Sequence, residues 1–179
     1  MSDEDPLARC YDAHAKGLFA YLLSLTHEEE DARDLLQETF LRLARQPDLL
    51  DAARSERAVL FRIAHNLAMD FHRRRTVRDR FLQSQGAQDS IPFAPAEDPD
   101  EAAFRAEAAR ALSDLPPEQR AVVHLKLWEG FTFEQIARVL EISPNTAASR
   151  YRYALDKLRI RLRRWVENSS QTTAGTMKP

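Results

Sequence analysis

The amino-acid sequence predicts an all-α protein made of two small helical domains joined by a flexible linker. Apolar residues recur at spacings of three and four over most of the chain, which is the period of a helix face. Only four of the 179 residues are glycine and 44% are hydrophobic, a composition that favours a globular helical protein. The stretch QSQGAQDSIPFAPAEDPD, rich in proline and acids, has no such period. We therefore expect helical domains at residues 5–76 and 101–166, the linker at 77–100 and a disordered tail at 167–179.

The first domain is predicted to hold three helices. The first apolar stripe covers residues 7–25. Thr26 and Glu29 then make a capping-box pattern, with Thr26 as the N-cap of a second helix that Pro47 ends. Ser55 can cap a third helix, which runs into three consecutive arginines.

The second domain is predicted to end in a helix-turn-helix. Residues 100–113 should form a helix, and two prolines open another helix that ends at Gly130. Thr132 is placed to cap a short helix that reaches Leu140. Ser143 caps a last long helix, with a proline at the first position, where a missing N–H costs nothing. A short helix, a three-residue turn and a longer helix match the geometry of a helix-turn-helix.

The second helix of this motif presents short polar side chains and arginines on its outward face. Side chains of these types contact base edges and phosphates in the major groove of DNA. We expect the DNA-contacting set to be Ser143, Asn145, Thr146, Ser149, Arg150, Arg152 and Tyr153. Glu141 occupies a turn position that commonly holds glycine, so we expect an adjusted turn.

Charge is segregated along the chain, although the net charge is only -2. Two basic blocks, residues 54–80 (net +5) and 138–164 (net +6), alternate with two acidic blocks, residues 1–53 (net −7) and 81–118 (net −6). Alternation of this kind indicates two separate contacts with an anionic partner, with acidic surfaces left for a protein partner.

Several functional classes find no support in the sequence. No apolar run reaches the roughly 18–20 residues that span a bilayer, and the N-terminus is acidic where a signal peptide is basic. Cys10 is the single cysteine, and with His14 it supplies only two ligands, too few for a structural metal site. The histidines lack metal-ligand spacing, and there is no phosphate-binding loop or nucleophile motif. We expect a cytoplasmic protein without membrane insertion, cofactor, metal site or catalytic residue.

The chain resembles the extracytoplasmic-function sigma factors of the sigma-70 family. The stretch ARDLLQETFLR (32–42) is similar to the family's region 2.2, which binds the clamp coiled coil of the polymerase β′ subunit. The resemblance implies a polymerase-binding set of Asp34, Gln37, Glu38, Phe40 and Arg42.

Residues 61–75, FRIAHNLAMD followed by FHRRR, are similar to regions 2.3 and 2.4, which melt and read the minus-10 element. Holding unstacked bases requires polar edge readers and cations near the strand. The minus-10 set is Arg54, Arg57, Asn66, Asp70, Arg73 and Arg74, and the loop at 46–55 would capture a flipped base. Val59 stands where relatives often have a tryptophan, which predicts weaker stacking at the upstream edge of the bubble.

Residues 112–158 resemble region 4, so the DNA-contacting set of the helix-turn-helix would read the minus-35 element. Ala148, Leu155 and Asp156 occupy positions that are usually basic in the family. The resemblance therefore implies that Arg150, Arg152 and Tyr153 make the main minus-35 contacts instead. The partners implied are core RNA polymerase, through its β′ clamp and β flap, promoter DNA and an anti-sigma factor.

Two other functions remain open. A stand-alone helix-turn-helix regulator with an N-terminal dimerisation or sensor domain explains residues 102–164 equally well. It gives no reason for the basic block before Arg75 or for the motif DLLQETF. An enzyme is the weaker alternative, because no nucleophile or phosphate-loop motif is present.

Overall fold

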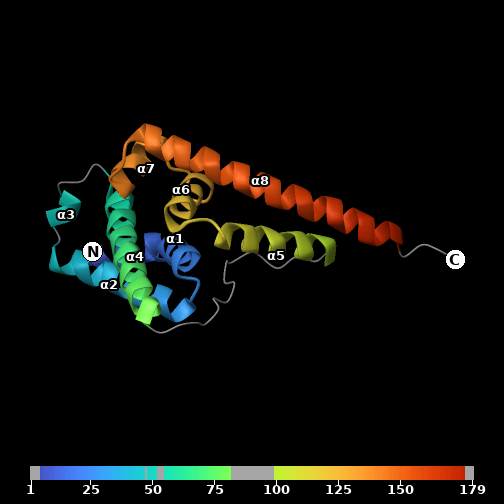
Figure 1. The fold of residues 1–179 in the computed structure, drawn as a ribbon. Helices are drawn as coiled ribbons and strands as arrows, with labels where there is room; N and C mark the ends of the chain where they lie inside the picture. Colours follow the sequence, from blue (N-terminus) through green and yellow to red (C-terminus); the bar gives the residue numbers. More distant parts are fainter. Residues whose placement is uncertain (1–4, 47, 52–54, 82–98, 176–179) are drawn as a thin grey trace.

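The computed structural model describes residues 5–46, 48–51, 55–81 and 99–175. These residues contain eight helices and no strand, which confirms the all-α prediction (Figure 1). The helices are α1 (Pro6–Thr26), α2 (Glu29–Arg45), α3 (Asp48–Asp51), α4 (Glu56–Phe81), α5 (Pro99–Ser113), α6 (Pro117–Leu127), α7 (Phe133–Leu140) and α8 (Pro144–Gly175). No helix among them is long and apolar enough to cross a membrane.

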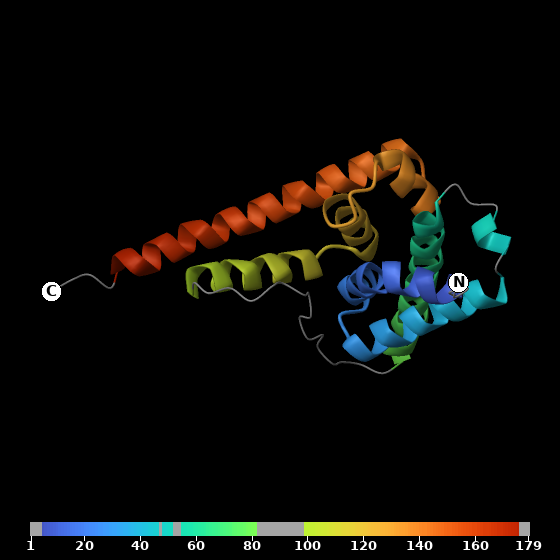
Figure 2. The ribbon, with the colours of Figure 1, turned by 180° about the vertical axis from the view of Figure 1, so that it is seen from behind.

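The helices form two groups that pack against each other. We call α1–α4 the N-terminal half and α5–α8 the C-terminal half. Helices α1, α2 and α4 pack together in the first, while α6, α7 and α8 pack together in the second. The halves meet where α1 contacts α6 and where α4 contacts α7. Helix α5 lies along α8, and the two extend away from the rest of the molecule as an arm (Figure 2).

One hydrophobic core runs through both halves. Tyr21 and Phe61 of the N-terminal half are fully enclosed in the same cluster as Val122, Leu125 and Ile136 of the C-terminal half. A second, smaller cluster joins α5, α6 and α8 around Leu112, Leu115, Val123 and Ala154. The core therefore crosses from one predicted domain to the other. Independent folding of each domain stays a prediction.

The junction between α1 and α2 differs from the predicted capping box. Helix α1 continues to Thr26, which is buried and donates its hydroxyl hydrogen bond to the backbone oxygen of Leu22, 3.1 Å away. His27 ends the helix in the left-handed conformation (φ 64), and Glu28 is the N-cap of α2, without a side-chain capping bond. The prediction of Thr26 as N-cap was wrong because α1 includes Thr26 and ends at His27, which leaves Glu28 at the N-cap position of α2.

Two predicted boundaries also differ. Helix α4 continues to Phe81, beyond the predicted linker start at residue 77, because no proline or glycine interrupts it. Helix α8 continues to Gly175 through most of the predicted tail. Arg163 and Glu167, one turn apart and 2.9 Å from each other, support this extension. The remainder of the predicted linker, residues 82–98, and of the tail, residues 176–179, lies outside the described residues.

Candidate nucleic-acid and polymerase interfaces

The helix-turn-helix is present where the sequence predicts it. Thr132 caps α7, since its hydroxyl accepts from the backbone N–H of Gln135 (3.2 Å), and the Gln135 side chain accepts from the backbone N–H of Thr132 (2.8 Å). The Ser143 hydroxyl accepts from the backbone N–H of Thr146 at 3.0 Å, as expected of the N-cap of α8. Both predicted caps are confirmed.

The turn between α7 and α8 is not adjusted, contrary to expectation. Glu141 adopts the left-handed conformation itself (φ 56, ψ 42). The backbone N–H of Ile142 then donates to the oxygen of Ala137 at 3.0 Å, which closes the turn. The motif keeps the geometry that a glycine would supply, at the conformational cost of a non-glycine residue with positive φ.

The predicted base-reading side chains are unequally accessible. Ser143, Asn145, Arg152 and Tyr153 are exposed, whereas Thr146, Ser149 and Arg150 are half-buried. The Tyr153 ring is 58% exposed, and the guanidinium of Arg152 lies 5.8 Å from its centre. Burial and then the charge of Arg150 lower the pKa of His65 on α4 to about 4.

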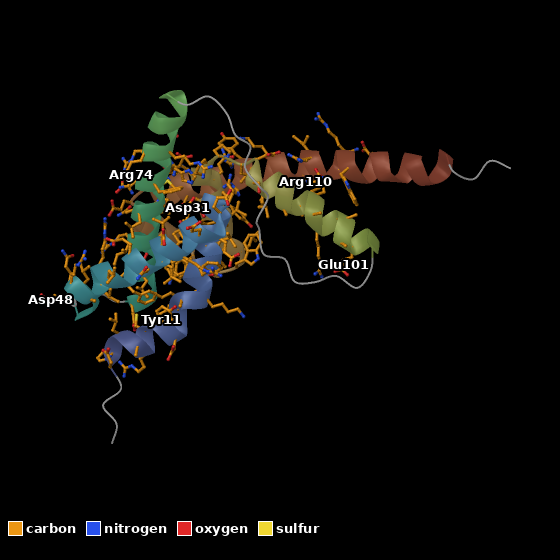
Figure 3. The ribbon with its side chains drawn as sticks, turned by 90° about the horizontal axis from the view of Figure 1, so that it is seen from below. Tyr11, Asp31, Asp48, Arg74, Glu101 and Arg110 are labelled. Carbon is orange, nitrogen blue, oxygen red and sulfur yellow. The ribbon has the colours of Figure 1, made fainter. Side chains whose placement is uncertain are left out.

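Helix α4 carries four of the six predicted minus-10 residues on one exposed side. Asn66, Arg73 and Arg74 are exposed, and Asp70 is half-buried. Arg73 donates to the Asp70 carboxylate. An ion pair this exposed contributes little, so Arg73 can exchange it for a phosphate. In Figure 3, Arg74 on α4 and Tyr11 on α1 both lie away from the arm of α5 and α8.

Of the other two minus-10 residues, the structure describes only Arg57, which does not join this surface. Arg54 lies outside the described residues. The guanidinium of Arg57 donates to the backbone oxygen of Glu129 at 2.8 Å and to its carboxylate. It also lies 4.6 Å from the centre of the Phe131 ring. Arg57 therefore faces the C-terminal half. Val59, the position predicted to weaken stacking, is buried and offers no stacking surface at all.

The predicted polymerase-binding residues lie on α2. Asp34, Gln37 and Arg42 are exposed and Glu38 is half-buried, 3.3 Å from the side chain of Arg42. Phe40 is only 7% exposed, because its ring packs 4.8 Å from that of Tyr11. Phe40 therefore belongs mainly to the core.

An open apolar groove lies between α1 and α2, and several residues that line it were not predicted as site residues from the sequence. Its volume is about 720 Å³, and its apolar lining includes Leu7, Tyr11, Phe19, Phe40 and Leu41. Tyr11, which lies in the first predicted apolar stripe, is 48% exposed, and Leu41 is 42% exposed. The groove adjoins Gln37, so an apolar surface lies beside the polar face of α2.

Cys10 is buried, and burial, assisted by Glu56, raises the pKa of its thiol to about 12. A thiol in this state is unreactive. Within the described ranges, no group of three or more histidine, cysteine, aspartate or glutamate side chains could hold a metal ion.

Comparisons with known proteins agree with the two halves of the fold. The family described as "Sigma-70 region 2" matches residues 10–78, and "Sigma-70, region 4" matches residues 105–158. The chain is 38% identical over 154 residues to the ECF RNA polymerase sigma factor SigL of Mycobacterium tuberculosis, a match that covers 85% of this chain and 86% of SigL. SigX of Bacillus subtilis, another ECF sigma factor, is 27% identical over 166 residues, covering 87% and 83% of the two chains.

The fold also resembles solved structures. The sigma factor RpoE of Bartonella quintana, in complex with the anti-sigma factor NepR, superposes with a TM-score of 0.72 at 24% identity, covering 87% of this chain and 96% of that one. CnrH, in complex with the cytosolic domain of CnrY, superposes with a TM-score of 0.61 at 24% identity, covering 86% and 85% of the two chains. With regions 2 and 4 matched in order and SigL similar over most of its length, this chain belongs to the extracytoplasmic-function RNA polymerase sigma factors.

Proposed function

We propose that this protein binds core RNA polymerase and directs it to promoters that carry minus-10 and minus-35 elements. The observation that carries the proposal is the presence, in one sigma-family chain, of two separate basic faces, on α4 and at the start of α8. A subunit that selects promoters by two separate elements must contact DNA at two places. We assign it no catalytic residue, and its place of action is with polymerase in the cytoplasm.

For the minus-10 element, we propose that the exposed side of α4 holds single-stranded DNA. Asn66 and Asp70 would bond to base edges, while Arg73 and Arg74 would hold phosphates. Arg54 and Arg57 complete this set at the start of the helix.

For the minus-35 element, we propose that the first turns of α8 enter the major groove. Arg152 and Tyr153 are accessible in the structure, and Arg150, which is half-buried there, would grip a guanine through two hydrogen bonds. The shorter side chains Ser143, Asn145, Thr146 and Ser149 would contact neighbouring bases and phosphates.

For polymerase, we propose that α2 binds the β′ clamp through Asp34, Gln37, Glu38 and Arg42, with Phe40 supporting the surface from beneath, and that the C-terminal half binds the β flap. The two solved relatives are complexed with NepR, an anti-sigma factor, and with the cytosolic domain of CnrY. We infer that this chain also has an anti-sigma partner that holds it inactive.

Transcription in vitro tests the proposal. Core polymerase with this protein should start transcripts at specific sites of a genomic fragment library where core polymerase alone does not. Replacing Asp34, Gln37 and Glu38 together by alanine should abolish association with core polymerase. The control replaces Asp156 and Arg159, an exposed ion pair on α8, together by alanine, and it should leave association with core polymerase unchanged. A protein that binds DNA but never associates with polymerase would instead be a stand-alone regulator.

A further inference from the structure

The two predicted DNA-reading surfaces lie too close together in this structure to serve one promoter. Helix α4 packs directly against α7, the first helix of the helix-turn-helix. The minus-10 and minus-35 elements are about 25 base pairs apart by definition, which is about 85 Å of B-form duplex. The halves must therefore separate before both elements are bound, and the structure is a closed form.

An ion pair links Arg57, a predicted DNA-binding residue of the N-terminal half, to an acid of the C-terminal half. Arg57 on α4 is 36% exposed, and Glu129, in the loop after α6, is 11% exposed. Arg57 donates to both the carboxylate and the backbone oxygen of Glu129. The rings of Phe131 and Phe61 lie 4.6 and 5.7 Å from its guanidinium. The charged end of Arg57 is thus occupied by the C-terminal half.

The N-terminal half has a place shaped for this carboxylate. A β-carbon added to Gly17 on α1 would lie only 3.2 Å from Oε1 of Glu129, so the absence of a side chain there admits the acid. Burial alone would raise the pKa of the Glu129 carboxyl, but contacts with His124 and Arg57 lower it. The acid is therefore ionised at neutral pH, and it meets a complementary site rather than open solvent.

We propose that Glu129 is an internal competitor for promoter DNA, which holds the free protein closed by occupying Arg57. One nitrogen of the guanidinium, Nη2, makes both bonds to Glu129, so a phosphate that binds Arg57 through this nitrogen must displace the carboxylate. In the closed form the contact withholds Arg57 from the minus-10 element. Separation of the halves on core polymerase releases it. The proposal rests on the proposed function, in which Arg57 binds DNA.

Three variants of the full chain test this competition. Glu129→Gln removes the charge and keeps the shape of the competitor, and Arg57→Ala removes the shared group. Glu134→Gln is the matched control, because it removes the same charge from α7, where Glu134 is fully exposed and faces its own half. The radius of gyration of the free protein, from small-angle X-ray scattering, reports closure. Anisotropy of a labelled, randomised single-stranded oligonucleotide reports DNA binding.

The expected pattern separates the two roles of Arg57. Glu129→Gln and Arg57→Ala should both expand the protein, but only Glu129→Gln should bind the oligonucleotide more tightly than the wild type, by about tenfold. Glu134→Gln should do neither. An unchanged radius of gyration in Glu129→Gln overturns the proposal.

Exchanging the two charges controls for the possibility that a single substitution expands the protein by unfolding it. Arg57→Glu alone should expand the protein, and adding Glu129→Arg should restore the compact form, with helical content by circular dichroism unchanged throughout. Failure of the exchange to restore compactness counts against the ion pair as the closing contact. Equal oligonucleotide binding by Glu129→Gln and Arg57→Ala would overturn the competition and remove Arg57 from the minus-10 set, while the transcription assay would still decide the proposed function independently.

Discussion

Two arginines join the halves of this molecule, and their surroundings are opposite in kind. Arg120 on α6 is 5% exposed and donates chiefly to backbone oxygens, those of Ser24 (3.0 Å), Leu112 (3.0 Å) and Leu115 (2.7 Å) among them, while its Nη1 also contacts the His27 ring. Arg57 is partly exposed, and among the described residues both its hydrogen bonds go to Glu129. The Arg120 contacts are enclosed and mainly to backbone oxygens, while the Arg57 contact is an ion pair that is partly exposed.

The difference explains which contact determines the fold and which can be exchanged. The carbonyls that Arg120 binds belong to the last turns of α1 and α5 and to the loop after α5, where oxygens lack the regular hydrogen bond of a helix interior. If the halves part, Arg120 keeps its partners in the C-terminal half, but Arg57 loses Glu129. Burial lowers the pKa of Arg120 only to about 10, so it stays charged at neutral pH. We therefore regard Arg120 as a determinant of the fold and Arg57 as an exchangeable link.

The largest effect should come from removing Arg120. Arg120→Met leaves several buried carbonyls without donors and should lower the free energy of unfolding by about 3–5 kcal/mol. Urea denaturation followed by circular dichroism measures the loss. Arg120→Lys should recover only part of it, because an ammonium group cannot reach as many oxygens as the planar guanidinium. A loss of unfolding free energy below about 1 kcal/mol in Arg120→Met would mean that Arg120 does not determine the fold.

Acid should lower the free energy of unfolding through His65, which lies in the core near the junction of the halves. His65 is 7% exposed, and its Nδ1 lies 2.9 Å from the hydroxyl of Tyr21. Burial and then the charge of Arg150 lower its pKa from 6.5 to about 4. Between these values the unfolded chain binds a proton that the folded protein excludes. The contribution is complete above pH 6.5 and is lost as the pH falls towards 4, by up to about 3 kcal/mol.

Unfolding free energies measured at several pH values between 7 and 4 test this dependence. His65→Gln retains a hydrogen-bonding side chain but does not titrate, so its stability should fall less steeply with acid. The same slope in the variant and the wild type would mean that other groups, such as His72, whose pKa is lowered chiefly by burial, carry the dependence.

Arg150 should differ from the arginines at the far end of α8. Arg150→Ala should reduce discrimination at one position of the minus-35 element by about 1–3 kcal/mol. Arg163→Ala with Arg164→Ala should weaken binding to all sequences alike and flatten the salt dependence. Binding of the polymerase complex to single-base promoter variants at two salt concentrations distinguishes them. Equal weakening at every variant by Arg150→Ala would make Arg150 a phosphate contact.

The smallest effects should come from two loops of the C-terminal half with the same backbone conformation. Glu141 (φ 56) and Gly130 (φ 66) are both left-handed, but only one is glycine. Glu141→Gly should raise the free energy of unfolding by about 0.5–1 kcal/mol, since glycine adopts this conformation without strain. Gly130→Ala should lower it by about 1 kcal/mol, although no atom lies within 4 Å of the added β-carbon. Thermal denaturation measures both, and shifts of the same sign would contradict the argument.

The sequence by itself determined the local features of this protein. Thr132 and Ser143 cap their helices as predicted, because a cap depends on side chains within three residues of each other. The helix-turn-helix and the exposed residues of α4 follow from a helical period of 3.6 in the same way. The lengths of α4 and α8 were less predictable: both helices continue past their predicted ends, since no proline or glycine lies at either predicted end to stop the helix.

Only the tertiary structure decided which predicted contacts remain accessible. Arg57 and Glu129 are 72 residues apart in the chain, and Arg120 and Ser24 are 96 apart, separations over which periodicity carries no information. Phe40 was predicted to contact polymerase but packs on Tyr11, and Arg150 is half-buried although it lies on the predicted outward face of its helix. A local pattern identifies the side chains of a face, whereas long-range packing decides whether that face meets solvent or the rest of the protein.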